Sequence, residues 1–253
     1  MKFIDIHCHI DVYGNEVENI IKRAREKDVF VIVNNGIDAK SNRKTLELSK
    51  KYLEIKAAIG LYPINALSMS ENEINKELKF IEKNKDKIVM IGEIGIDLKE
   101  SDELGRQIEI FEKFIRLATK LNMFIAVHSR NAEKECIEVL ERLGAKKVLM
   151  HCFSGGMKLV NKIVENRWFL SIPSSVKYNE HFQKIVEIVP LENLFCETDS
   201  PYLHPNREKN NEPMSVIESY KKIAEIKGLK LEEVAIKIWE NWERMIKNKK
   251  DKL

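Results

Sequence analysis

Six polar side chains in this sequence close short apolar runs, and all six are of the types that hold divalent metals. His7 and His9 stand one residue apart in FIDIHCHID, residues 3–11. Four later apolar runs end in, or next to, the same residue types: Glu93, His128, His151 and Asp199. Burying a polar group is unfavourable unless a partner compensates it. The six side chains together therefore predict a site for one or two divalent cations.

The spacing of the first two histidines suits a shared cation. Side chains alternate along a strand, so Asp5, His7 and His9 face the same way, and the two histidines lie about 6.6 Å apart along the strand. Both imidazoles can then converge on one ion. Taken alone, the spacing also fits an amphipathic strand that exposes two histidines to water. The four other ligand types at strand ends favour the metal site.

The ligand types also restrict the metal. Imidazole and carboxylate without thiolate favour zinc or manganese, and magnesium is less natural because it prefers oxygen ligands. A catalytic zinc typically takes three protein ligands and leaves one position for water. Six ligands therefore suit two ions about 3.5 to 4 Å apart that share a bridging carboxylate. Such a pair activates water and stabilises the attacking and leaving oxygens of a phosphodiester.

The elements that must position these ligands form a repeating pattern. Short apolar runs alternate with longer segments whose apolar residues recur three and four apart, as in helices. The eight strand-like runs are 3–7, 29–35, 55–60, 88–93, 123–128, 147–152, 168–172 and 194–199. They predict a (β/α)8 TIM barrel in one domain, residues 1–253. The alternative is an open doubly wound sheet, which is disfavoured because no GxGxxG pattern follows the first run.

The C-terminal part predicts one further element. LEEVAIKIWENWERMI, residues 231–246, has the pattern of an extra helix on the outside of the barrel, with Trp239 and Trp242 as its anchors. The last residues, KNKKDKL (247–253), predict a solvated and frayed end.

Composition and charge narrow the class of protein. Hydrophobic residues make up 43% of the chain and charged residues 33%, which is typical of a globular protein. No run of about 18 apolar residues and no signal-peptide pattern occurs, so we expect a cytoplasmic protein without a membrane partner. Nothing indicates an obligatory protein partner. The four cysteines form no CxxC pair and predict reduced, structural thiols, with Cys152 pointing away from the metals because it follows His151 on a strand.

Six motifs follow one another along the chain: FIDIHCHID (3–11), GEIGID (92–97), VHSR (127–130), HCFSG (151–155), ETDSPYL (197–203) and NEP (211–213). In this order they resemble the motifs of the TatD-type metal-dependent deoxyribonucleases of the amidohydrolase superfamily. The resemblance spans residues 3–213. It implies a distorted TIM barrel with a two-metal site that hydrolyses phosphodiester bonds in DNA, often as an exonuclease.

The resemblance also implies how the ligands divide between the two ions. The first ion would be held by His7, His9 and Asp199. The second would be held by His128 and His151, and Glu93 would bridge the two. Asp199 would also be the general base, since a carboxylate beside an activated water can take its proton at neutral pH. Asp5 is expected to support His7 or its strand from behind.

Three further residues are candidates for contact with DNA. Arg130, two residues after His128, faces the same side and can grip a phosphate, or it pairs with a neighbouring acid. Tyr202 and His204 follow Asp199 in a loop flanked by prolines. There they can stack on a base or contact a phosphate, and the alternative is that they hold the loop in place.

The chain departs from the family pattern at the expected mouth of the pocket. Tyr62 stands where a histidine is common, Leu98 and Lys99 replace a usual aromatic residue, and REKNNEP (207–213) lacks a glycine and a basic residue. The substrate is therefore less firmly implied than the metal site. The alternative is an amidohydrolase or esterase acting on a small molecule or an acylated nucleic acid. A nucleic-acid-binding protein with structural metals is a third class, against which the net charge of +3 argues mildly.

Overall fold

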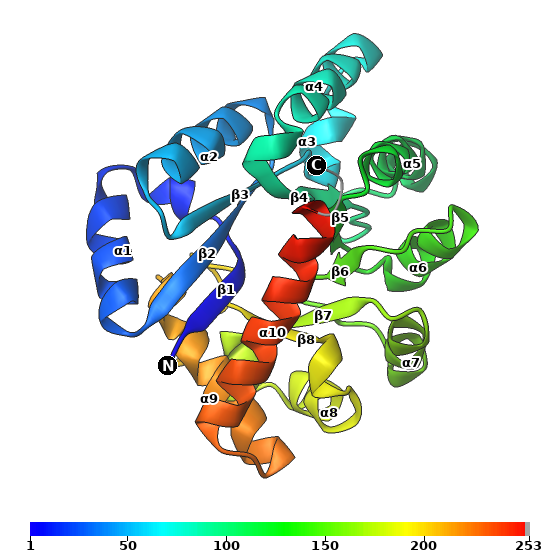
Figure 1. The fold of residues 1–253 in the computed structure, drawn as a ribbon. Coiled ribbons are helices and arrows are strands. Elements are labelled where there is room, and N and C mark those ends of the chain that lie inside the picture. The colour runs from blue at the N-terminus through cyan, green and yellow to red at the C-terminus, as the bar shows by residue number, and fades with distance from the viewer. Residues whose placement is uncertain (251–253) are drawn as a thin grey trace.

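The computed structural model describes residues 1–250, with the side chains of residues 1–247. Eight parallel strands follow one another in chain order around a barrel (Figure 1). They are β1 Phe3–Cys8, β2 Val29–Gly36, β3 Ile55–Ile59, β4 Ile88–Gly95, β5 Phe124–His128, β6 Val148–Met150, β7 Phe169–Pro173 and β8 Leu194–Glu197. The predicted TIM barrel is confirmed. The open doubly wound alternative is wrong, because the strand order never reverses.

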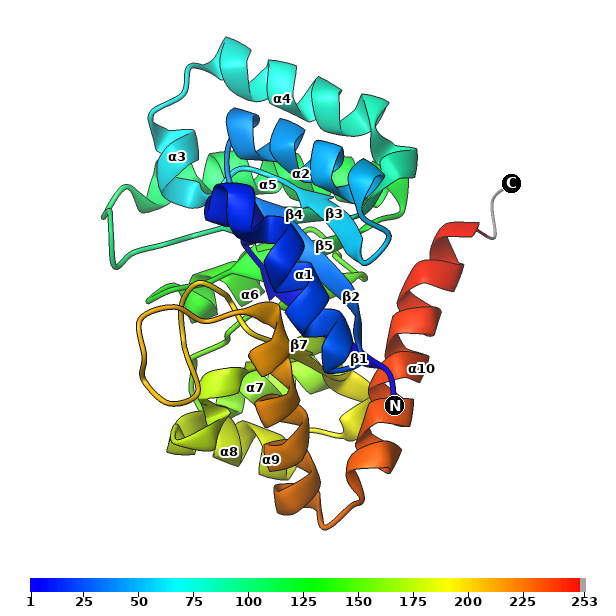
Figure 2. The same cartoon turned by 90° about the vertical axis from the view of Figure 1, so that its left-hand side faces the viewer.

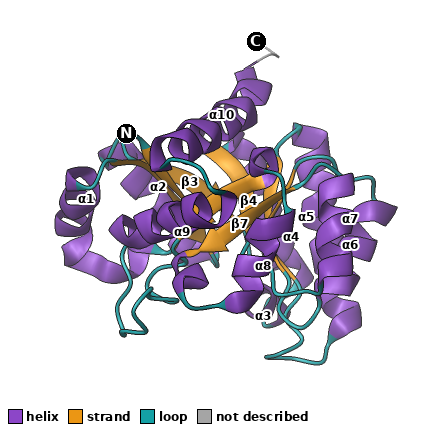
Figure 3. Cartoon of the chain, turned by 90° about the horizontal axis from the view of Figure 1, so that it is seen from below, coloured by secondary structure: helices purple, strands orange, loops and turns teal. Residues whose placement is uncertain are grey.

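Helices surround the strands on the outside (Figure 3). They are α1 Val17–Glu26, α2 Ala39–Lys51, α3 Pro63–Leu67, α4 Glu71–Lys83, α5 Leu104–Leu121, α6 Glu133–Arg142, α7 Met157–Glu165, α8 Glu180–Ile188 and α9 Ile217–Lys227. Short 3-10 turns occupy Ile10–Glu16, Lys85–Lys87, Ser174–Lys177, Leu191–Asn193 and Pro213–Val216. The helices bury one apolar face against the barrel, as Phe111 and Phe114 of α5 illustrate. None of the described helices is both long and apolar enough to cross a membrane.

The predicted extra helix is α10, Leu231–Lys250, and it lies on the side of the barrel where the N-terminus lies (Figure 2). Trp242 is buried, and the side-chain amide of Asn241 donates hydrogen bonds of 2.9 Å to the carbonyls of Leu191 and of Leu194, at the start of β8. Trp239 is partly buried, with the ammonium of Lys2 over its ring. The helix continues into the segment expected to fray. The remaining part of that segment, 251–253, lies outside the described residues.

Asp5 stands in the seam where β1 meets β8. One oxygen of its carboxylate accepts hydrogen bonds from the backbone N–H of Thr198 (2.9 Å) and of His7 (3.3 Å), and the other accepts from the Thr198 hydroxyl (2.5 Å). Burial raises the pKa of Asp5 well above its ordinary value, although the Thr198 hydrogen bonds oppose the shift. The Asp199 N–H continues the seam by donating to the carbonyl of His7 at 3.0 Å. Asp5 thus joins the segments that carry His7 and Asp199, and it contacts the backbone of His7 rather than its ring.

Three strands end earlier than the sequence predicts: β3 by one residue, and β6 and β8 by two. β6 ends at Met150 and β8 at Glu197, so His151, Cys152 and Asp199 lie in the turns that follow. Cys152 has a φ of 43° and lines the central cavity. The prediction that Cys152 points away from the metal ligands is therefore wrong, because the alternation of side chains stops where the strand stops.

Candidate metal centre

The six predicted metal ligands meet at the carboxyl ends of the strands, where a cavity of about 610 Å³ opens. Five of them line this cavity: His9, Glu93, His128, His151 and Asp199. The sixth, His7, is fully buried against them. This end of the barrel is where TIM-barrel enzymes place their active sites. The barrel thus brings together side chains from its first strand and from the turn after its last strand.

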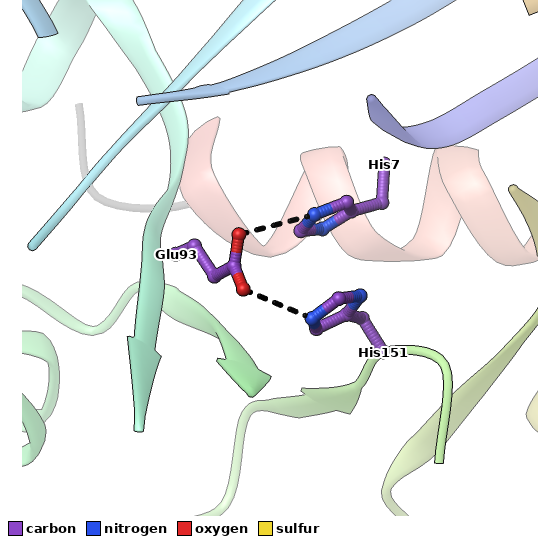
Figure 4. A group of neighbouring side chains, drawn as sticks. All are labelled: His7, Glu93 and His151. Atoms are coloured by element: carbon purple, nitrogen blue, oxygen red, sulfur yellow. Dashed lines mark hydrogen bonds and ion pairs between the residues drawn. The ribbon is translucent and has the colours of Figure 1, made fainter. Parts of the chain in front are cut away.

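Glu93 lies between two pairs of histidines. Its Oε2 is 3.5 Å from Nε2 of His7 and 3.4 Å from Nε2 of His9. Its Oε1 is 2.8 Å from Nδ1 of His128 and 3.2 Å from Nε2 of His151. Figure 4 shows the two oxygens pointing to different rings, those of His7 and His151. One carboxylate therefore faces two separate sets of nitrogen donors.

Two glycines of β4 permit the close approach that places Glu93. A Cβ atom on Gly95, where φ is 147°, would lie only 1.9 Å from the carbonyl oxygen of His128. A Cβ atom on Gly92 would lie 2.6 Å from the side chain of Ala126. The sequence GEIG therefore lets β4 pack directly on β5, because glycine alone lacks the atom that would collide. This packing brings Glu93 next to His128.

Asp199 completes the first set of donors. Its Oδ1 lies 3.7 Å from Nε2 of His7 and 3.6 Å from Nε2 of His9. The residue has a φ of 51°, in the left-handed region, and its N–H bonds to the carbonyl of His7. The turn after β8 thus carries this carboxylate onto the two histidines of β1.

The donor atoms fit divalent metal ions. Both ring nitrogens of His7 are buried and have no hydrogen-bond partner among the described residues. Leaving a buried polar group without a partner costs about 1 to 3 kcal/mol. Donor atoms of His7, Glu93 and His151 lie within 4.8 Å of one another, as do those of His7, His9 and Asp199. Cations bound among them would satisfy the nitrogens that the protein itself leaves unpaired.

Two carboxylates behind the histidines were missed at the sequence level. Asp97 Oδ2 accepts hydrogen bonds from Nε2 of His128 (2.9 Å) and from the Tyr62 hydroxyl (2.5 Å). Glu197 Oε2 lies 3.7 Å from Nδ1 of His151. Both stand inside recognised motifs, GEIGID and ETDSPYL. A second carboxylate at or just past each strand end was the signal that could have identified them.

The charges of these groups depend strongly on one another. Burial alone would raise the pKa of Glu93, but the charge of His151 and a hydrogen bond from His128 hold it well below the ordinary value. Burial would lower the pKa of His9, yet its ion pair with Asp199 and the charge of Glu93 raise it to about 9. Without a metal, the site therefore holds ionised carboxylates beside protonated imidazoles, that of His9 among them. Metal binding must displace these protons.

The proton on His9 is one reason why the stability of the metal-free protein depends on pH. The stabilisation from His9 is complete below about pH 6.5 and is lost as the pH rises through about 9, because the folded pKa exceeds the ordinary value of 6.5. The difference is worth about 3 kcal/mol, or roughly 6 to 12 °C in melting temperature. We expect chelator-treated protein to melt at a lower temperature at pH 9.5 than at pH 6.5. The variant His9→Gln should show a smaller difference than the native protein, and an undiminished difference there would exclude His9 as a source. A part of the difference should remain, because the pKa values of His128 and His151 are also raised.

The candidate substrate contacts lie in different places. Arg130 and Tyr202 line the cavity, and the Arg130 guanidinium is 3.2 Å from the carboxylate of Glu100. His204 is not among the lining residues. Its Nδ1 instead accepts a hydrogen bond of 3.1 Å from the backbone N–H of Asn206 within the same loop. The contacts of His204 thus match the alternative that it holds the loop in place. Arg130 pairs with an acid, Glu100, and also reaches the cavity, so both of its predicted roles remain open to it.

The chain is similar to known proteins over nearly its whole length. Residues 4–247 match the family model described as TatD related DNase. A relative from Methanocaldococcus jannaschii, named an uncharacterized metal-dependent hydrolase, is 37% identical over 95% of each chain. The human Deoxyribonuclease TATDN3 is 32% identical over 91% of this chain and 89% of its own. The crystal structure of the Escherichia coli TatD homologue YJJV superposes with a TM-score of 0.91, at 24% identity, over 97% of this chain and 98% of that one.

Proposed function

Because this chain belongs to the TatD family of metal-dependent hydrolases, we propose that it is a deoxyribonuclease that removes nucleotides from the ends of DNA. The name of its human relative supports phosphodiesters as the bonds that it cleaves. A single domain over residues 1–253 and a cytoplasmic location remain predictions from the sequence.

The observation that carries the proposal is the placement of Glu93. Its two oxygens face two sets of donors, which suits two divalent cations, zinc, manganese or magnesium, with Glu93 as the bridge. His7, His9 and Asp199 would hold one cation, and His128 and His151 the other. Two such cations supply the Lewis acidity that lowers the pKa of water and neutralises charge on a phosphodiester.

Asp199 is the proposed proton acceptor. Burial would raise its pKa, but the ion pair with His9 and the charges of the neighbouring histidines hold it below the ordinary value. The carboxylate is therefore ionised at neutral pH and able to take a proton from the attacking water. It also lines the cavity, so the water and the scissile bond can reach it.

Two side chains at the cavity are proposed to bind DNA. Arg130 has about half of its side chain exposed and can exchange the carboxylate of Glu100 for a phosphate, which guanidinium binds in a bidentate manner. Tyr202 is 62% exposed and offers an aromatic face to a terminal base.

The proposed activity predicts a clear order of substrates. With zinc, manganese or magnesium added to chelator-treated protein, linear DNA should be hydrolysed faster than amides, carboxylate esters or acylated nucleic acids, and chelator should stop the reaction. End-labelled linear DNA should release mononucleotides, while circular single-stranded DNA should resist. Faster cleavage of an amide or ester at equal enzyme would replace the nuclease by the amidohydrolase alternative. Salt-sensitive DNA binding without turnover in any metal would point to the non-catalytic class.

A further inference from the structure

We propose that Asp97 and Glu197 are positioning residues for only one of the two cations, the one held by His128 and His151. The inference rests on the two-cation site proposed above. Both carboxylates are completely buried, which is rare for acidic residues unless they are paired. Each lies behind a different ligand histidine, on the side away from Glu93.

Asp97 determines which nitrogen of His128 faces the site. An ionised carboxylate oxygen can only accept a hydrogen bond, so the 2.9 Å contact places a proton on Nε2 of His128. Nδ1 is then the nitrogen that faces Glu93, at 2.8 Å. Asp97 is itself held firmly, since its Oδ2 accepts from the Tyr62 hydroxyl and its Oδ1 accepts from the N–H of Lys99 at 2.9 Å. The orientation of the His128 ring is therefore set by a rigid support.

Glu197 has the corresponding place behind His151. Its Oε2 accepts a 2.7 Å hydrogen bond from the Ser171 hydroxyl and lies 3.7 Å from Nδ1 of His151. That nitrogen and the second oxygen of Glu197 are buried without a hydrogen-bond partner among the described residues. Nε2 of His151 faces Glu93 at 3.2 Å. Glu197 is thus placed to attract a proton to Nδ1 and to leave Nε2 for the cation.

The other pair of histidines has no such carboxylates in the part of the chain that the structure describes. Nδ1 of His9 donates to the backbone carbonyl of Asn35 at 2.9 Å, and Nδ1 of His7 has no hydrogen-bond partner. The carboxylate of Asp199 faces both of these histidines, so it would supply negative charge to that cation as a ligand.

A cation held by His128 and His151 would have only Glu93 as a carboxylate ligand. Further negative charge from the protein would act on it through the two imidazole rings. A carboxylate behind a ligand imidazole raises its basicity and fixes its orientation, and losing one typically weakens metal binding about 10- to 100-fold. We therefore expect the effect of Asp97 and Glu197 to fall on this cation alone.

The test is a zinc titration of chelator-treated protein labelled with 15N at its six histidines. Ring nitrogen shifts of His7 and His9 report one cation, and those of His128 and His151 report the other. In Asp97→Asn and, separately, in Glu197→Gln, the midpoints for His128 and His151 should move to about 10- to 100-fold higher free zinc. The midpoints for His7 and His9 should stay within about threefold. In the zinc-loaded native protein, the ring proton should be on Nε2 of His128 and on Nδ1 of His151.

The controls separate positioning from general damage. Glu54→Gln removes a buried carboxylate that pairs with Arg25 away from the cavity, and it should shift no midpoint. Unchanged signals of His181 and His204 show that a variant is folded; if one variant unfolds, the other decides. Equal shifts at all four ligand histidines, no shift at any, or the opposite ring tautomers would overturn the proposal. DNA is absent throughout, so selective shifts in a protein that cleaves no DNA would reject the nuclease function and leave this inference standing.

Discussion

Replacing Asp199 with asparagine is expected to lower the rate of DNA hydrolysis about 100- to 10,000-fold, the range that a positioned proton acceptor contributes. Asparagine has nearly the same shape but cannot take a proton, and it removes the charge that faces His7 and His9 at 3.7 and 3.6 Å. The backbone bond from residue 199 to the His7 carbonyl remains available, so the fold should persist. Initial rates on end-labelled DNA at saturating metal, together with circular dichroism, provide the measurement.

The matched control for this variant is Asp28→Asn. Asp28→Asn replaces the same carboxylate by the same amide, but at an exposed position before β2, where Asp28 pairs with the N-terminal amine. Its φ of 59° suits asparagine, which tolerates left-handed backbone. The control should keep the native rate. A folded Asp199→Asn protein that also keeps the native rate would remove Asp199 from the mechanism.

Replacing Glu93 with glutamine is expected to have the largest effect of all, because this one side chain faces both donor sets. We expect the bound metal to fall from two ions per chain to at most one. The loss of metal-based stabilisation, worth several kcal/mol, should lower the rate by about 1000-fold or more. Elemental analysis after dialysis measures the metal content, and the DNA assay measures the rate.

Glu54→Gln is again the matched control, since it removes a buried carboxylate from the same type of residue outside the cavity. It should retain two ions and the native rate. If Glu93→Gln binds two ions as tightly as the native chain, then Glu93 does not bridge them, and the division of ligands proposed here is incorrect.

The alternation of strands and helices was predictable because each element buries its apolar residues with its own period. All eight strand-like runs overlap an observed strand, and the α10 helix begins at the predicted residue. The ligands were recognisable for a related reason. A histidine or carboxylate that ends an apolar run, as His128 does, is unfavourable without a partner, and a parallel barrel collects strand ends at one rim.

Strand ends and contacts across the barrel were harder to predict. Cys152 was assigned to the wrong side because hydrophobicity continues past Met150 while the hydrogen-bonded strand does not. The anchoring of His204 depends on the path of its loop, which follows from local hydrogen bonds rather than from periodicity. The positions of Cys152 and His204 both depend on how the backbone turns after a strand. The hydrophobic pattern of the sequence does not predict that turn.

The sequence by itself determined the fold class, the family and the six side chains available to bind metal, because periodicity, motif order and the cost of burying polar groups are properties of the chain alone. The resemblance also implied how the ligands divide between two cations. Only the tertiary structure decided which oxygen of Glu93 faces which pair of histidines, and that Asp97 and Glu197 stand behind one pair. These relations join residues from different strands. They are set by how the strands pack around the barrel, which a pattern along one strand does not specify.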